Sequence, residues 1–189
     1  MDHISTDCVK QYKVNVPDEC SKFEVTADKL IRFELNKMQA IIYVGSRKTA
    51  DMLYESLDKY FEPFSYDVSI VHADLAHKDR DTIVKDFNER FTQILITTDS
   101  LAEGFDHSLV NLVVNYDLPV TRASEEPDID VYLQRLCFYN GAVFNLLCGN
   151  RDNMIMERIE KNLNQDVIQV PSWTSIEKFI LASNRAGLN

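Results

Sequence analysis

The chain has 189 residues, of which 45% are hydrophobic and 26% charged, with five glycines and five prolines. This composition is typical of a globular protein and excludes a disordered or fibrous one. The formal net charge of −10 excludes a surface broadly adapted to nucleic acid, because phosphate neutralisation supplies most non-specific affinity. The sequence shows neither an apolar run of about 18 residues nor a start typical of a signal peptide, so we expect an intracellular protein.

The hydrophobic pattern predicts strands that alternate with helices. Expected strands cover residues 9–16, 39–44, 68–71, 93–96, 111–115, 142–147 and 167–170. Expected helices cover residues 19–36, 47–61, 78–90, 129–139, 154–163 and 176–183, with Ser46 as the N-cap of the second. This order predicts βαβ units and a parallel sheet in one α/β domain over residues 1–189, with frayed ends at 1–7 and 184–189.

Polar residues follow the expected strands at the points where the strands end. Strand carboxyl ends share one edge of a parallel sheet, where open α/β sheets bind their ligands. The residues that we expect there are Gly45, Ser46, Arg47, Lys48, His72, Asp74, Lys78, Arg80, Thr97, Thr98, Asp99, Gly104, Asp106, Tyr116 and Asp117. Four of them are cations at helix starts, and the pattern leaves open whether they bind phosphate or are simply solvated.

Other classes of site find less support. Asp99 and Asp106 could hold Mg²⁺, although aspartates in such loops more often bond to backbone or to a ligand hydroxyl. No G-x-x-x-x-G-K-[ST] loop and no G-x-S-x-G elbow occurs. The cysteines have no C-x-x-C spacing, so reduced thiols are favoured over a zinc site or a redox pair; they are Cys8, Cys20, Cys137 and Cys148.

Three ordered segments resemble the second RecA-like lobe of DEAD-box RNA helicases. They read AIIYVGSRKTADMLYESL, VSIVHADLAHKDRDTIVKDF and ILITTDSLAEGFDHSLVNLVVNYDLP. The resemblance covers nearly the whole chain and implies a three-layer α/β/α fold of the P-loop NTPase type. Within the family, KTADMLY, VSIVHADL, VVNYDLP and VPSWTSIEKF are most similar to the branch that acts in mRNA export at the nuclear pore.

The resemblance implies RNA-binding roles for Gly45, Ser46, Arg47, Arg80 and Thr98, all toward the sugar–phosphate backbone. Contacts of this kind position RNA without reading its sequence. The family's arginine element begins with a glutamine, and His77 stands at that position here.

The resemblance implies nucleotide contacts from Gly104, Asp106 and Arg135. The sequence departs from two of the family's nucleotide-binding motifs, which weakens this expectation. Glu103 replaces an arginine of the family's A-R-G-x-D motif. In the family's H-R-I-G-R-x-G-R motif, the last two arginines reach the γ-phosphate. Phe138 and Gly141 stand at those positions here, and the segment is shortened. Arginines of this kind can contribute a factor of about 10³–10⁵ to phosphoryl transfer.

The resemblance implies one lobe of an ATP-dependent RNA helicase that uses ATP with Mg only together with an N-terminal RecA-like lobe. Implied partners are that lobe, RNA bound weakly and jointly with it, and a nuclear-pore activator with inositol hexakisphosphate. The implied locations are the cytoplasm, the nucleus and the rim of the nuclear pore. The departures keep open a degenerate, non-catalytic lobe that serves as a protein-interaction module. A flavodoxin-like domain that binds a phosphorylated ligand explains the sheet but not the ordered segments.

Overall fold

The computed structural model of the chain describes residues 9–32, 39–98, 106–136 and 141–188. Its centre is a seven-stranded sheet in the order β3-β4-β2-β5-β6-β1-β7, with every strand pair parallel. The strands are β1 (Val9–Val16), β2 (Gln39–Tyr43), β3 (Val68–Val71), β4 (Ile94–Thr97), β5 (Val110–Asn115), β6 (Gly141–Cys148) and β7 (Ile168–Gln169). The sequence-based expectation of a parallel α/β sheet is therefore confirmed.

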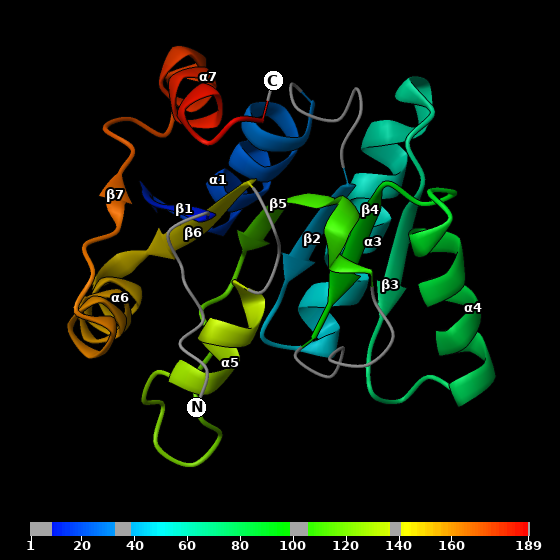
Figure 1. Cartoon of the computed structure of the whole chain (residues 1–189), viewed down its shortest axis with the longest axis horizontal. Helices are drawn as coiled ribbons and strands as arrows, with labels where there is room; N and C mark the ends of the chain where they lie inside the picture. Colours follow the sequence, from blue (N-terminus) through cyan, green and yellow to red (C-terminus); the bar gives the residue numbers. More distant parts are fainter. Residues whose placement is uncertain (1–8, 33–38, 99–105, 137–140, 189) are drawn as a thin grey trace.

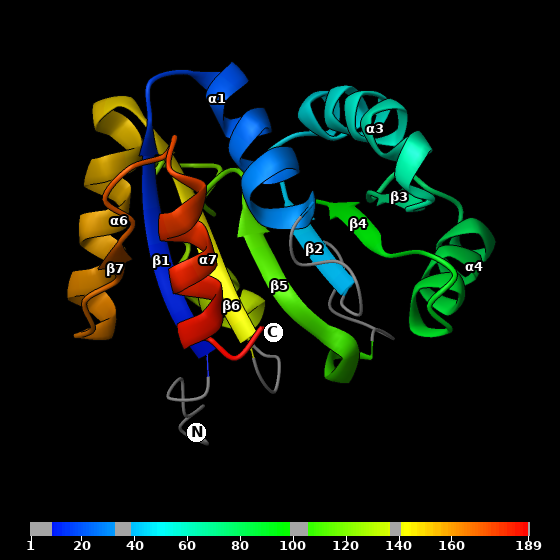
Figure 2. The same ribbon diagram turned by 90° about the horizontal axis from the view of Figure 1, so that it is seen from above.

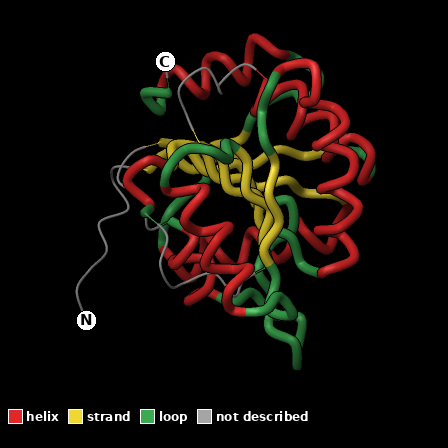
Figure 3. The backbone as a smooth tube through the Cα atoms, turned by 90° about the vertical axis from the view of Figure 1, so that its right-hand side faces the viewer, coloured by secondary structure: helices red, strands yellow, loops and turns green. Residues whose placement is uncertain are grey.

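Helices cover both faces of the sheet, which gives three layers (Figures 1 and 3). The first core packs the sheet against α1 (Glu19–Glu24), the π-helical segment η2 (Val25–Ile31), α3 (Arg47–Phe61) and α7 (Ile176–Arg185). The second core packs the other face against α4 (His77–Asn88), α5 (Ile129–Arg135) and α6 (Gly149–Leu163). Short 3₁₀ turns, η3 (Glu62–Phe64) and η4 (His107–Leu109), follow α3 and precede β5. In Figure 2, α6 and β7 lie at one end of the sheet and α3 and α4 at the other.

Two inner strands of the sheet are buried along their whole length. All residues of β2 and of β4 are buried, as expected for parallel strands that are covered on both faces. Among the described residues, no helix combines the length and the apolar character that a membrane crossing requires.

Several element bounds differ from those expected. The helix expected over 19–36 is α1 continued by the wider turns of η2, and residues 33–38 lie outside the described ranges. Helix α6 begins at Gly149 rather than at residue 154, because Asp152 Oδ2 accepts the Cys148 N–H at 2.9 Å and satisfies the helix start. The strand expected over 167–170 has only the two residues of β7.

Candidate functional site

The carboxyl edge of the sheet, where all the parallel strands end, brings together two of the four predicted cations, one after β2 and one after β3. Arg47, the first residue of α3, places Nη1 2.9 Å from Asp74 Oδ2. Arg80, on the first turns of α4, donates from Nη2 to the Ala73 carbonyl at 3.3 Å. Two arginines that are distant in sequence therefore meet on one short segment after β3.

Gly45 and Ser46 lie between β2 and α3, and together with Arg47, the first residue of α3, they form the segment called here the 45–47 loop. All three residues are exposed. Ser46 is the N-cap of α3, because its Oγ accepts the Thr49 N–H at 3.1 Å, which confirms that prediction. Thr98 is half-buried and directly follows β4. Since β4 lies between β3 and β2 in the sheet, the five predicted RNA-binding residues all come from neighbouring strand ends.

Two buried nitrogen atoms at this edge have no hydrogen-bond partner among the described residues. They are Nδ1 of His72, a residue with an exposed fraction of only 7%, and Nε of Arg80. Buried polar atoms in folded proteins are normally hydrogen-bonded. The segment after β3 therefore contains two buried nitrogen atoms whose hydrogen bonds the described residues do not supply.

Asp106 lies at the opposite edge of the sheet, which corrects the expectation that it joins the strand ends. Its N–H donates to Asn88 Oδ1 at 2.9 Å, and Asn88 ends α4. Its Oδ1 accepts the Ser108 N–H at 2.9 Å at the start of η4. The physical reason is the parallel arrangement, because the chain must return to the amino edge before β5 begins. Gly104, Glu103 and Asp99 lie outside the described residues.

Arg135 is buried, with an exposed fraction of 3%. Its Nη1 donates to Asn115 Oδ1 at 2.7 Å and to the Asp117 carbonyl at 3.0 Å, and the guanidinium lies 4.5 Å from the centroid of the Tyr43 ring. The Asn115 amide continues this contact by donating to Asn145 Oδ1 at 2.8 Å. The described contacts of Arg135 are thus internal, and its role toward a nucleotide stays a prediction.

The Asn145 amide extends this buried chain of polar groups away from the carboxyl edge. It donates to the Tyr12 carbonyl at 3.0 Å and to the Tyr132 hydroxyl at 3.2 Å. The Tyr132 hydroxyl in turn donates to Gln11 Oε1 at 2.8 Å. The second core therefore contains a polar path among its apolar side chains.

Gly141 is the first residue of β6 and occupies one of the two positions matched to the family's phosphate-contacting arginines. Its φ is +141°, and a Cβ at this position would lie 2.0 Å from the Asn111 carbonyl oxygen. The tight backbone contact between β5 and β6 leaves no room for any side chain. Phe138, the other position, lies outside the described residues.

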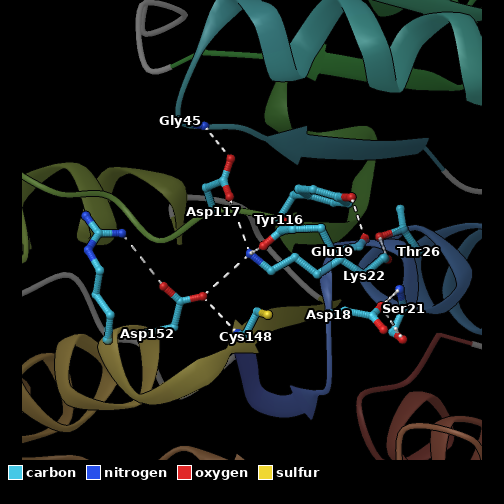
Figure 4. Close-up of polar contacts among 11 residues, drawn as sticks. Asp18, Glu19, Ser21, Lys22, Thr26, Gly45, Tyr116, Asp117, Cys148 and Asp152 are labelled. Carbon is cyan, nitrogen blue, oxygen red and sulfur yellow. Dashed lines mark hydrogen bonds and ion pairs between the residues drawn. The ribbon is translucent and has the colours of Figure 1, made fainter.

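Lys22 is a buried cation that sequence reasoning missed. Only 2% of its side chain is exposed, and its Nζ lies 3.2 Å from Glu19, 3.4 Å from Asp117 and 3.5 Å from Asp152 (Figure 4). Burial lowers the pKa of Lys22, but the three carboxylates outweigh burial and the net pKa is raised. In the sequence, Lys22 occupies an ordinary polar position on an amphipathic helix, so no local signal identified it.

For Tyr116, in contrast to Lys22, burial raises the pKa, and the nearby Glu19 and Asp117 carboxylates raise it further. The ring of Tyr116 lies 5.5 Å from Lys22 Nζ, and its hydroxyl donates to the Glu19 carbonyl at 3.2 Å. Tyr116 is therefore a neutral member of this cluster at physiological pH.

The described part of the chain contains neither an assembled metal site nor an assembled nucleotide site. No three His, Cys, Asp or Glu side chains there come close enough to hold a metal ion. Cys20 and Cys148 are free thiols, and the other two cysteines lie outside the described ranges. Asp106 and Arg135 lie apart, so the described residues do not fit a complete nucleotide site in this lobe by itself.

Comparisons with known proteins identify the family. The family described as "Helicase conserved C-terminal domain" matches residues 21–137. The chain is 43% identical over 192 residues to DEAD-box ATP-dependent RNA helicase 38 of Arabidopsis thaliana, covering 98% of this chain and 38% of that protein. It is 31% identical over 185 residues to the ATP-dependent RNA helicase DBP5 of Saccharomyces cerevisiae, covering 94% of this chain and 37% of that protein.

Solved structures agree with the sequence comparisons. The structure of S. cerevisiae Dbp5 bound to RNA and ADP BeF3 matches with a TM-score of 0.82 and 29% identity, over 94% of this chain and 45% of that one. The C-terminal domain of Dbp5 matches with a TM-score of 0.80 and 28% identity, over 96% of this chain and 99% of that domain. The chain thus spans 38% and 37% of the length of the two curated relatives. The chain belongs to the helicase conserved C-terminal domain family and carries the C-terminal, RecA-like domain of a DEAD-box RNA helicase.

Proposed function

We propose that this chain is the second lobe of an ATP-dependent RNA helicase that acts in mRNA export, and that this lobe binds the RNA backbone. The observation that carries the proposal is the convergence of Arg47 and Arg80 on the segment after β3, with Thr98 directly after β4, the strand between β3 and β2. The unsatisfied nitrogens of His72 and Arg80 support a polar ligand at the same place. The similarity to a Dbp5 structure that contains RNA supports RNA as that ligand.

The proposed contacts need little rearrangement of the lobe. Arg47 pairs with Asp74, but their side chains are 57% and 69% exposed, and exposed ion pairs contribute only about 0–1 kcal/mol. An RNA phosphate can therefore displace Asp74 at small cost, and a charge-assisted bond to phosphate is stronger than a neutral one. Gly45 and Ser46 would bring backbone and hydroxyl groups close to the RNA backbone, and Thr98 would add a second hydroxyl.

We assign the nucleotide to the interface with an N-terminal lobe, which would hold ATP with Mg. Gly104, Asp106 and Arg135 are the residues proposed to complete that site from this lobe; Asp106 lies at the amino edge of the sheet here, so its contribution would require the segment before β5 to rearrange. Because the described residues do not converge there, we expect these 189 residues alone neither to bind ATP measurably nor to hydrolyse it. Solved structures of Dbp5 contain RNA, Gle1, IP6 and Nup159, which supports a nuclear-pore activator with inositol hexakisphosphate as partners and the pore rim as location.

RNA binding tests the first part of the proposal. Fluorescence anisotropy with a single-stranded oligouridine should show weak, salt-dependent binding, and Arg47→Ala should lower the salt slope by about 0.7 for each phosphate contact that is lost. Arg158→Ala is the matched control, because Arg158 is also an exposed arginine in an ion pair, here with Glu126 on the α6 side. An unchanged slope in Arg47→Ala would contradict the proposed contact.

A degenerate, non-catalytic lobe is the second candidate, favoured by two observations. Arg135 is occupied by internal contacts, and position 141 excludes a side chain. Joining an N-terminal lobe with a phosphate-binding loop to this chain and measuring RNA-stimulated ATP turnover separates the candidates. Turnover near that of an intact helicase supports the enzyme, whereas no turnover with retained activator binding supports the interaction module.

A further inference from the structure

Asp117 connects the end of β5 to the start of the 45–47 loop. Its Oδ2 accepts the Gly45 N–H at 2.8 Å, and its own N–H donates to the Tyr43 carbonyl at 3.2 Å. Gly45 is exposed to solvent, so the bond from Asp117 protects an amide that would otherwise face water. Figure 4 shows the Asp117 carboxylate between Gly45 and Lys22.

Lys22 determines where the Asp117 carboxylate lies. Its Nζ reaches Asp117 Oδ1 at 3.4 Å and Asp152 Oδ2 at 3.5 Å. These carboxylates are only 29% and 15% exposed, and like charges in a poorly solvated place repel each other. Without the cation, the Asp117 carboxylate would turn toward solvent, and this change weakens its bond to Gly45.

We propose that Lys22 and Asp117 are positioning residues that fix the 45–47 loop in its RNA-binding conformation. Lys22 lies in α1, Asp117 follows β5 and the loop follows β2, so the pair ties three distant segments to one backbone N–H. The RNA part of this inference rests on the proposed function. The effect on the loop itself does not depend on RNA.

The chain contains a matched arrangement of the same chemistry elsewhere. Lys13 Nζ lies 2.8 Å from Glu160 Oε1, and this carboxylate oxygen accepts the Val167 N–H at 2.7 Å. Cation, carboxylate and backbone N–H thus recur between β1, α6 and the segment before β7. Lys13→Met therefore removes a comparable cation without touching the 45–47 loop.

Amide hydrogen exchange followed by NMR on the full chain tests the positioning role. In Lys22→Met, the Gly45 amide should exchange at least about tenfold faster, because local opening governs protection, while Val167 keeps its rate. In Lys13→Met, the Val167 amide should exchange faster, while the Gly45 amide keeps its rate. Lys22→Arg, which retains the charge, should return the Gly45 rate toward that of the wild type. Equal Gly45 rates in Lys22→Met and Lys13→Met would overturn the proposal.

A second variant keeps the test decisive if Lys22→Met does not fold. Asp117→Asn retains an acceptor for the Gly45 N–H but removes the charge that faces Lys22, so a smaller acceleration at Gly45 is expected. An unchanged Gly45 rate in Asp117→Asn would also overturn the proposal.

Oligouridine affinity then links the loop to function. Lys22→Met should bind about tenfold more weakly, because re-ordering the backbone of even one residue costs about that factor, and Lys13→Met should bind as the wild type does. Wild-type affinity in a Lys22→Met variant with an accelerated Gly45 amide would refute the RNA part of the inference. If the wild-type chain itself binds no RNA, the proposed function fails, whereas the exchange pattern at Gly45 still decides the positioning role.

Discussion

Placing a side chain at position 141 should destabilise the fold severely. In Gly141→Ala, the new Cβ would lie 2.0 Å from the Asn111 carbonyl oxygen and 2.7 Å from its carbon, and φ at this position is +141°. A backbone conformation that side chains avoid costs about 1–3 kcal/mol, and overpacking costs about 1–3 kcal/mol more. The sum of about 2–6 kcal/mol is a large part of the roughly 5–15 kcal/mol that stabilises a typical domain.

Urea unfolding of Gly141→Ala measures this loss, and Gly149→Ala is the matched control. Gly149 also has a positive φ, +79°, but a Cβ there would meet no atom within 4 Å. The control should therefore lose only the conformational part, about 1–2 kcal/mol. With a slope of about 1–3 kcal/mol per molar urea, Gly141→Ala should lower the midpoint by about 1 M or more. A loss no larger than that of Gly149→Ala would refute the steric argument.

The buried polar groups give two further predictions. Tyr132→Phe should lower the free energy of unfolding by about 1–3 kcal/mol in thermal denaturation, because Gln11 and Asn145 lose their shared hydroxyl partner; a melting temperature equal to that of the wild type would contradict this. Burial raises the pKa of Tyr116 and Tyr132, and carboxylates raise that of Lys22. Groups with raised folded-state pKa stabilise fully below their ordinary values and lose this contribution as pH rises through the raised pKa. Urea unfolding at stepped pH should therefore show stability falling above about pH 10, and a flat profile there would argue against these burial effects.

The sequence predicts the elements best where the hydrophobic pattern and the residues that begin or end an element agree. Residues 9–16 alternate apolar and polar side chains before Pro17, and β1 has the expected bounds. Ser46 marks the start of α3 because its hydroxyl is a good cap. The early start of α6 was missed because Gly149 and Asn150 are poor helix formers and the Asp152 contact that satisfies this end is visible only in three dimensions.

The candidate site was predictable where it depends on strand order alone. The strand-end residues after β2, β3 and β4 are neighbours because the strands are parallel and adjacent. Asp106 was misplaced because position in the sequence does not tell where a crossover returns to the amino edge. Lys22 could not be identified because two of its acidic partners, Asp117 and Asp152, are brought to it only by the packing of α1 against the ends of β5 and β6. The third, Glu19, forms an ordinary i,i+3 pair on the same helix.

The paired asparagines of β5 and β6 have a consequence for how the sheet assembles. Asn115 stands directly opposite Asn145 in the strand pairing, and both are fully buried. The surrounding strand residues are nearly all apolar and distinguish poorly between alternative registers. Sliding β6 by one residue would turn Asn145 to the other face, and the buried Asn115 amide would lose the Asn145 oxygen that accepts its hydrogen bond. A few polar groups thereby select one strand alignment from among several that hydrophobic burial alone would accept.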